Sequence, residues 1–460
     1  MASGPFDLRM GALRRAYQAG TITPSDLVQH ILSRLDDADQ SAVWISTTTK
    51  DKLIARAREL EGLADSGRDL PLYGIPFSVK DNIDVEGEET TAACPGFAYR
   101  AEHSATVVER ALAAGAIYVG KTNLDQFATG LVGVRSPYGI PVNPFNADYI
   151  PGGSSSGAAV SVATGVVSFA FGTDTGGSGR IPASYNGLVG FKPAPGDWSR
   201  HGLVFACRSF DTPSVFTNGL EDALTVDGAV RGPDGLDPYS TDFMRSDDGT
   251  PRVAVLQPDL ARNLCEPEIL GLFQEACDAI STLFPSVTPA DLSPFQALND
   301  LMFFGPLLAE RDVSVGAFID AQPDACHPIV ASLVQSSRKF TAADAYRALY
   351  RIRDTQGETA GFWKKFDVMI TPTVSSFITL AMCEDDPLGP NFRNGTFTNF
   401  ANPLGLAAIA VPFGHSEAGV PWGITLYSPP ERVPAMIQVA ASLEQRGHAA
   451  EPHLMSASES

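Results

Sequence analysis

The residues of this sequence best suited to covalent chemistry are two serines, each at the end of a glycine-rich turn. They lie in the stretch 149–191, as Gly152-Gly153-Ser154 and Gly176-Gly177-Ser178. Glycine permits a sharp turn and a close approach to a ligand, and free backbone N–H groups in such a turn can bind an oxyanion. The alternative for a Gly/Ser-rich run is a flexible linker. The apolar segments 158–163 and 166–171 are untypical of linkers and predict a folded, buried stretch.

Ser155 offers a competing nucleophile. Residues 153–157 fit the pattern GxSxG, in which Ser155 would belong to a Ser-His-acid triad. That pattern needs a strand leading into the serine, whereas 143–151 is typical of a loop, and none of the seven histidines lies in a recognisable motif. A phosphate-binding loop is less well supported, because no Gly-Lys-Ser/Thr follows the glycines.

Lys80 is a candidate base. It ends the apolar segment 72–80, which predicts a buried strand, and Asp81 and Asp84 follow it. A lysine there could instead reach solvent or pair with one of these carboxylates, which is the usual fate of lysine. Further along the chain, the Gly-rich loop 129–137 could line a pocket.

The elements that must position these residues alternate between strand and helix. A strand at 72–80, a helix from Thr106 to Gly115 with capping-box spacing to Glu109, and a strand at 116–120 form a βαβ pattern. Within the serine-rich stretch we expect a helix at 156–164 and a strand at 166–171. Further strands are expected at 188–191, 253–256, 366–370, 406–412 and 423–427. Outer helices are expected from a Thr23 cap to Leu35 and at 50–64, a helical layer at about 258–365 that includes 341–366, and a last helix at 434–445.

Composition restricts the class of protein. The chain has 460 residues, 44% hydrophobic and 19% charged, with a net charge of −20. An acidic chain argues against nucleic acid and anionic membranes as partners. No signal peptide and no apolar run of about 18 residues is evident. The six cysteines form no CxxC pair, which predicts neither a zinc site nor a disulfide framework and favours reduced thiols in the cytoplasm.

The order of Lys80, the 152–157 turn and the segment 174–180 resembles the amidase-signature family, over about residues 20–445. The resemblance implies an α/β fold: a large twisted mixed β-sheet covered by helices on both faces, in a single domain at 1–446 with a polar tail at 447–460. It also implies that Ser178 is the acyl nucleophile, Ser154 a bridging serine on a cis peptide bond, and Lys80 the base.

The chemistry of such a set is coherent. A serine hydroxyl is weak until a base takes its proton. The ordinary pKa of lysine is about 10.4, so a lysine that is neutral near pH 7 needs a shift of about 3 units, which burial can supply. Ser154 can relay the proton because a hydroxyl both donates and accepts. The N–H groups of Thr175, Gly176 and Gly177 are the expected oxyanion hole. Structural support for the turn is expected from Asp174 and Arg180.

Within that family, residues 120–139, 91–95 and 206–209 resemble the allophanate hydrolase subgroup. Allophanate is urea that carries a carboxylate, so its enzyme needs a cation. Residues 305–311 match the segment that supplies this cation, which makes Arg311 the candidate, unless it is a surface residue paired with Glu310 or Asp312. The subgroup usually has tyrosine where this chain has Phe303. Gly130 and Phe303 complete the expected substrate-binding residues.

The resemblance thus implies hydrolysis of allophanate to ammonia and N-carboxycarbamate, without metal or organic cofactor. It implies a homodimer, with urea carboxylase as a pathway partner, and many members of the subgroup continue into a C-terminal domain that would be missing here. Alternatives are an amidase for another small ureido acid such as carboxybiuret, and the A-type subunit of a tRNA-dependent amidotransferase. The intact Lys-Ser-Ser set argues against a non-catalytic interaction protein.

Overall fold

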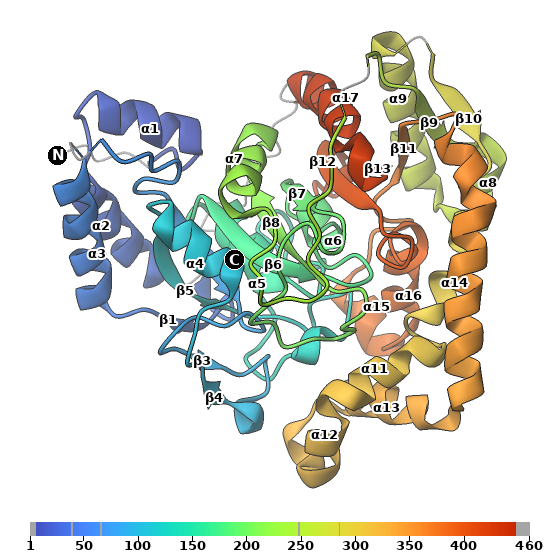
Figure 1. Ribbon diagram of the computed structural model, residues 1–460, viewed down its shortest axis with the longest axis horizontal. Coiled ribbons are helices and arrows are strands. Elements are labelled where there is room, and N and C mark those ends of the chain that lie inside the picture. Colours follow the sequence, from blue (N-terminus) through green and yellow to red (C-terminus); the bar gives the residue numbers. More distant parts are fainter. Residues whose placement is uncertain (1–5, 38–39, 65–66, 247–248, 285, 448–460) are drawn as a thin grey trace.

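A mixed β-sheet carries the residues of interest (Figure 1). The computed structural model describes residues 6–37, 40–64, 67–246, 249–284 and 286–447, and eleven strands of this part form one sheet in the order β1-β5-β2-β6-β8-β7-β12-β13-β11-β9-β10. The strands are β1 (Trp44–Thr47), β2 (Pro76–Lys80), β5 (Ile117–Thr122), β6 (Phe169–Asp174), β7 (Val189–Lys192), β8 (Thr212–Thr217), β9 (Val253–Leu256), β10 (Thr288–Ala290), β11 (Val368–Pro372), β12 (Ala407–His415) and β13 (Pro421–Ser428). A separate ribbon pairs β3 (Glu89–Thr90) with β4 (Tyr99–Arg100).

Both faces of this sheet are covered, as predicted. Strand β2 runs parallel to both of its neighbours, β5 and β6, and every residue of β2, β6, β7 and β8 is buried. On one face the rings of Phe77 and Phe169 stack with centroids 5.1 Å apart. On the other face Ser78 Oγ lies 2.9 Å from Ser161 Oγ of helix α5 (Ser156–Ala163). Successive strand residues point to opposite faces, so β2 alternates between the two layers.

The expected helices form, with one correction. The remaining α-helices near the sheet are α1 (Met10–Gln18), α2 (Pro24–Leu35), α3 (Lys50–Leu63), α4 (Thr106–Ala113), α6 (Ile181–Tyr185), α7 (Leu220–Val230), α15 (Leu380–Asp385), α16 (Gly389–Asn394) and α17 (Val433–Gly447). Thr23 caps α2 in a capping box with Asp26. The capping box predicted at Thr106 is wrong, because Ala105 is the N-cap and the Thr106 hydroxyl donates to Asp234 instead.

The described residues of 258–365 form the expected helical layer with one exception. It contains α8 (Pro258–Leu264), α9 (Pro267–Leu283), α10 (Ser293–Gln296), α11 (Ala309–Arg311), α12 (Ala317–Ala321), α13 (Pro328–Ser336) and α14 (Ala342–Trp363). Figure 1 shows α14 along one side of the molecule, with α11 to α13 gathered near one end of it. The exception is β10, an edge strand of three residues that pairs with β9.

Other features of the chain bear on the remaining expectations. All six cysteines are free. None of the helices in the described part is long and apolar enough to cross a membrane. The polar tail expected at 447–460 lies, beyond Gly447, outside the described residues.

A buried ion pair occupies the carboxyl end of β2. Lys121 Nζ of β5 lies 2.9 Å from Asp81 Oδ1, and both side chains are fully buried. The other carboxylate oxygen of Asp81 accepts the backbone N–H of Thr91 at 2.9 Å. Asp84 accepts hydrogen bonds from Thr90 and Tyr99. Neither carboxylate therefore contacts Lys80. The alternative interpretation, in which Lys80 pairs with Asp81 or Asp84, is wrong.

We expect Lys121→Met to lower the free energy of unfolding by about 3–5 kcal/mol, because it leaves the Asp81 carboxylate buried and unpaired. Urea denaturation followed by circular dichroism measures this change. Adding Asp81→Asn to Lys121→Met should recover part of the loss, since the orphaned charge is then removed.

The matched control is Lys52→Met, because Lys52 forms an ion pair with Glu88 while its own side chain is 59% exposed. Its effect should stay below about 1 kcal/mol. Equal losses in Lys121→Met and Lys52→Met would contradict a stabilising role for the buried pair.

Candidate active site

Three side chains from separate segments form a continuous chain of polar contacts. Lys80 Nζ lies 2.7 Å from Ser154 Oγ, and Ser154 Oγ lies 2.9 Å from Ser178 Oγ. All three residues are buried, with Ser178 at 2% exposure. Each hydroxyl can donate one hydrogen bond and accept others. The arrangement can therefore carry a proton from Ser178 through Ser154 to Lys80 when the lysine is neutral.

The position of Lys80 favours its neutral form. It is the last residue of β2, and its Nζ donates to Thr173 Oγ1 at 2.8 Å as well as to Ser154, so that it contacts two hydroxyls rather than a carboxylate. Burial lowers the pKa of Lys80 to about 7, although the nearby carboxylates of Asp125, Asp211 and Asp174 oppose the shift. Near neutral pH a large fraction of this lysine is thus available as a base.

Ser154 is presented by an unusual backbone segment. The peptide bond between Gly153 and Ser154 is cis, as the family resemblance implied. Asp125 braces the segment, because its N–H donates to the carbonyl of Ser154 at 3.0 Å and its carboxylate accepts the N–H of Gly133 at 3.0 Å. A Cβ at Gly153 or at Gly130 would collide with that carboxylate. Gly130 therefore lies beside the turn of Ser154.

The competing serine is directed elsewhere. Ser155 Oγ donates to the carbonyl of Thr173 at 3.2 Å, and α5 begins at the next residue. The segment before it, 143–151, contains no helix or strand, so the strand that a nucleophile elbow requires is absent there. None of the histidines in the described ranges hydrogen-bonds to Ser154, Ser155 or Ser178. The Ser-His-acid interpretation has no structural support.

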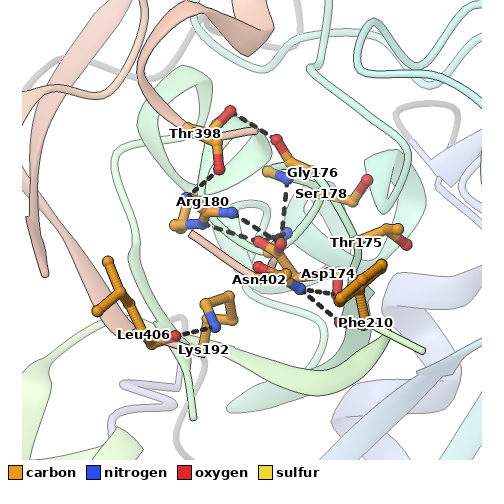
Figure 2. A network of polar contacts seen from close by, with 12 residues as sticks. Asp174, Thr175, Gly176, Ser178, Arg180, Lys192, Phe210, Thr398, Asn402 and Leu406 are labelled. Carbon is orange, nitrogen blue, oxygen red and sulfur yellow. Dashed lines mark hydrogen bonds and ion pairs between the residues drawn. The ribbon is translucent and has the colours of Figure 1, made fainter. Parts of the chain in front are cut away.

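The turn that carries Ser178 follows β6 directly. Asp174, the last residue of that strand, accepts the N–H of Gly177 at 3.0 Å and that of Gly179 at 2.9 Å, and it forms a fully buried ion pair with Arg180 at 2.8 Å (Figure 2). Burial raises the pKa of Asp174, but Arg180 and the backbone donors more than offset this, so the pKa stays below its ordinary value. Asp174 and Arg180 thus hold this turn through hydrogen bonds and an ion pair.

The same contacts correct the predicted oxyanion hole. The N–H of Gly177 is already bound to Asp174, so it is not free for a ligand. In the described part of the chain no acceptor is found for the N–H groups of Thr175, Gly176 and Ser178. These three donors remain available at the turn. The difference arises because a glycine-rich pattern does not reveal which of its N–H groups a neighbouring carboxylate will take.

A segment far along the chain clamps this turn. The family resemblance extends over this segment, but it assigned no role to Thr398 or Asn402. Thr398 Oγ1 donates to the carbonyl of Gly176 at 2.6 Å, and Arg180 donates to the carbonyl of Thr398 at 3.0 Å. Asn402 Nδ2 donates to the carbonyl of Asp174 at 2.7 Å. Figure 2 shows these residues grouped around the turn. A threonine and an asparagine in a loop are common, so their types alone do not predict this clamp.

A second buried lysine lies beneath this network. Lys192, the last residue of β7, donates to the carbonyls of Leu406 at 2.6 Å and Pro193 at 3.0 Å. Burial lowers its pKa to about 7, while Asp174 opposes the shift. Its hydrogen bonds are directed to the backbone, and none reaches Ser178.

Asp211 is another residue that sequence reasoning missed. Its carboxylate accepts hydrogen bonds from Thr175 Oγ1 at 2.5 Å and from the N–H of Ala206 at 2.7 Å. Burial raises the pKa of Asp211 to about 6 against the effect of these donors and of Arg311. The adjoining segment 206–209 contributes to the family resemblance, but an aspartate that precedes a strand gives no sign that its partner is the nucleophile turn.

Arg311 lies in the interior, with most of its hydrogen-bonding capacity unused. It is 1% exposed, Nη1 donates to the carbonyl of Met302 at 3.2 Å, and Nε and Nη2 have no hydrogen-bond partner. Its guanidinium lies over the ring of Phe303, 5.2 Å from the centroid. A Cβ on Gly176 would lie 3.3 Å from the edge of the same ring, so Phe303 connects Arg311 with the nucleophile turn.

The two acidic neighbours of Arg311 in the sequence have other partners. Glu310 accepts the N–H of Ser209 at 2.8 Å, and Asp312 pairs with Arg338 at 2.8 Å. The surface interpretation of Arg311 is therefore wrong. Among the described residues no group of three or more His, Cys, Asp or Glu side chains could hold a metal ion.

The chain is similar to known proteins over most of its length. A family profile described as Amidase matches residues 26–432. The urea amidolyase of Saccharomyces cerevisiae is 39% identical over 405 residues, which cover 87% of this chain but only 22% of the yeast protein. A Kluyveromyces lactis allophanate hydrolase structure is 34% identical with a TM-score of 0.88 and covers 95% of this chain and 72% of its own. The A-type subunit of the glutamyl-tRNA(Gln) amidotransferase of Natranaerobius thermophilus is 30% identical, over 95% of each chain.

The chain spans about a fifth of the yeast relative, whereas the family profile extends over most of the chain described here. These matches show that the chain belongs to the amidase family and is an amidohydrolase that acts on carbon–nitrogen bonds.

Proposed function

We propose that Ser178 is the nucleophile of this amidohydrolase, with Ser154 as the proton relay and Lys80 as the base. The observation that carries the proposal is the unbroken contact chain of 2.7 Å and 2.9 Å between a buried lysine and two serines. Ser178 Oγ attacks the carbonyl carbon of the amide while its proton passes to Ser154, whose own proton passes to Lys80. Lys80 returns a proton through the same path to the leaving nitrogen, and ammonia departs.

The free N–H groups of Thr175, Gly176 and Ser178 would stabilise the oxyanion that forms on the carbonyl oxygen. Water then attacks the acyl-enzyme, again assisted by Lys80 through Ser154, which releases the acid and restores Ser178. The contacts of Asp174 and Thr398 support this proposal, because they hold the turn from both sides before substrate arrives.

Allophanate is the substrate that we infer. It is hydrolysed with one water to ammonia and N-carboxycarbamate, which can lose carbon dioxide. Arg311 supports this choice, since its unpartnered Nε and Nη2 can form two parallel hydrogen bonds to one carboxylate. Phe303 offers a flat apolar wall beside the guanidinium, and Gly130 borders the turn of Ser154. The allophanate hydrolase and urea amidolyase relatives favour the same substrate.

One alternative has a specific observation in its favour. The A-type amidotransferase relative matches this chain over 95% of both lengths, whereas the urea amidolyase match covers 22% of that relative. An enzyme of the amidotransferase type would release ammonia from glutamine. A screen of ammonia release from allophanate, biuret, carboxybiuret, malonamate and glutamine separates the candidates, and glutamine as the best substrate would replace our proposal.

The setting of the reaction follows from the substrate. An enzyme that carboxylates urea must supply allophanate, so we infer urea carboxylase as the pathway partner, a role that the urea amidolyase relative supports. The six free cysteines favour the reducing cytoplasm. We further propose a homodimer, on family resemblance.

Ser178→Ala should abolish ammonia release, because no other hydroxyl can form the acyl-enzyme. Ser154→Ala should lower kcat by about 10²–10⁴-fold through loss of the proton relay. Ser155→Ala is the matched control and should retain most of the activity, since Ser155 Oγ is bonded to Thr173. A Ser155 variant that is inactive while Ser178→Ala still turns over would reverse the assignment.

The pH dependence should report Lys80. Because this lysine must be neutral to accept a proton, kcat/KM should rise with pH through about 7, the value to which burial lowers its pKa, and then level off. Lys80→Ala should remove nearly all activity, and His201→Ala should leave the profile unchanged. If the pH profile of kcat/KM shifts in His201→Ala, the rise with pH reports a base other than Lys80.

Arg311→Ala should raise KM for allophanate by about 10- to 100-fold, as expected for loss of hydrogen bonds to a charged group. The KM for biuret, in which a neutral amide replaces the carboxylate, should change much less. Arg338→Ala is the control, because Arg338 pairs with Asp312 and Asp320 at the surface. Equal effects on both substrates would exclude Arg311 as the carboxylate ligand.

A further inference from the structure

Two buried side chains near the Phe303 ring have polar groups without hydrogen-bond partners. One is the guanidinium of Arg311 described above. The other is the side-chain oxygen of Asn399, which is 3% exposed and accepts no hydrogen bond. A Cβ on Gly176 would lie 2.7 Å from Asn399 Oδ1 and 3.3 Å from the edge of the Phe303 ring. The orphaned oxygen therefore faces the turn that carries Ser178.

Local contacts fix which atom of the Asn399 amide faces the turn. Its Nδ2 donates to the carbonyl of Asn299 at 3.4 Å, and its backbone N–H donates to the carbonyl of Gly395 at 3.1 Å. The preceding residue, Thr398, is bonded to Gly176. The amide thus points its nitrogen toward Asn299 and its oxygen toward the nucleophile turn.

An unpartnered acceptor in this place is costly unless a ligand satisfies it. Leaving a buried polar group without a hydrogen bond costs about 1–3 kcal/mol. An amide oxygen has no hydrogen to give, so only an N–H or O–H donor can satisfy it. Arg311 is the opposite case, because its free groups only donate. The site is therefore complementary to a small molecule that has a hydrogen-bond donor near the reacting carbon and an anionic acceptor farther away.

The structure assigns Asn399 as a specificity-determining residue: we propose that its Oδ1 accepts a hydrogen bond from the N–H that joins the carbonyl and carboxylate groups of a ureido acid. This inference rests on the proposed function, with Arg311 holding the carboxylate. In such a molecule the bridging N–H lies between the carbon that Ser178 attacks and the carboxylate. Asn399 Oδ1 lies correspondingly close to Gly176, two residues before the nucleophile, while Arg311 lies over the Phe303 ring, whose edge is also near Gly176.

Allophanate and malonamate provide the test, because malonamate has a CH₂ group where allophanate has the bridging N–H. Asn399→Ala should lower the ratio of kcat/KM for allophanate to that for malonamate by on the order of 10-fold. Both values come from the same enzyme preparation, so any loss of folded protein cancels from the ratio.

Asn399→Asp is the rescue variant. It keeps an oxygen acceptor at the same position, and its charge acts on the carboxylate of both substrates alike, so the ratio should stay near that of the unmodified enzyme. Asn263→Ala, at an exposed position of α8, is the matched control and should change neither value.

An Asn399→Ala variant that loses both activities by the same factor would overturn the inference, since Asn399 would then act only on the shape of the turn. The proposed function fails by a different result, namely no ammonia release from allophanate by the unmodified enzyme while another amide is hydrolysed. The two failures are therefore distinguishable.

Discussion

The removal of Lys80 from water is the constraint on which the rest of the site depends. A lysine that contacted a carboxylate would stay protonated and could not accept the proton of a serine. The fold prevents this contact by giving each nearby carboxylate other partners: Asp125 binds backbone N–H groups, Asp174 binds Arg180, and Asp81 pairs with Lys121. The charges of Asp125, Asp211 and Asp174 still act at a distance, and burial outweighs them, so that the pKa of Lys80 is about 7.

The nucleophile turn depends in the same way on residues remote in sequence. Asp174 ends a buried strand and binds two N–H groups of the turn, while Thr398 and Asn402 bind its carbonyls from a segment more than two hundred residues away. Since Gly177 gives its N–H to Asp174, the donors left for a substrate are set by this support. Binding at the turn is therefore prepared by contacts that the substrate never touches, and little reorganisation is needed when it binds.

The sequence allowed more of the catalytic residues to be predicted than of the strands that position them. The resemblance to the amidase-signature family implied that Lys80, Ser154 and Ser178 act together, and the structure brings their side chains into contact. Strands β1, β8 and β10 were missed, since they are short or contain proline and lack an apolar run. Asp125, Asp211 and Asn399 were missed for another reason: a single polar residue carries no periodic signal, and its role exists only through partners that the folded chain brings to it.

The two buried lysines, Lys80 and Lys192, make the stability of the whole protein depend on pH. Burial lowers the pKa of both Lys80 and Lys192 to about 7, whereas an exposed lysine in the unfolded chain has a pKa near 10.4. Between these values the unfolded chain binds more protons than the folded one, so the contribution of these two lysines to folding stability improves as pH rises from about 7 and is fully regained above about 10.4. Hydrolysis that liberates ammonia makes its surroundings more alkaline. Ammonia from the proposed reaction would thus raise the pH around the protein. At higher pH Lys80 is neutral, and the two buried lysines destabilise the fold less.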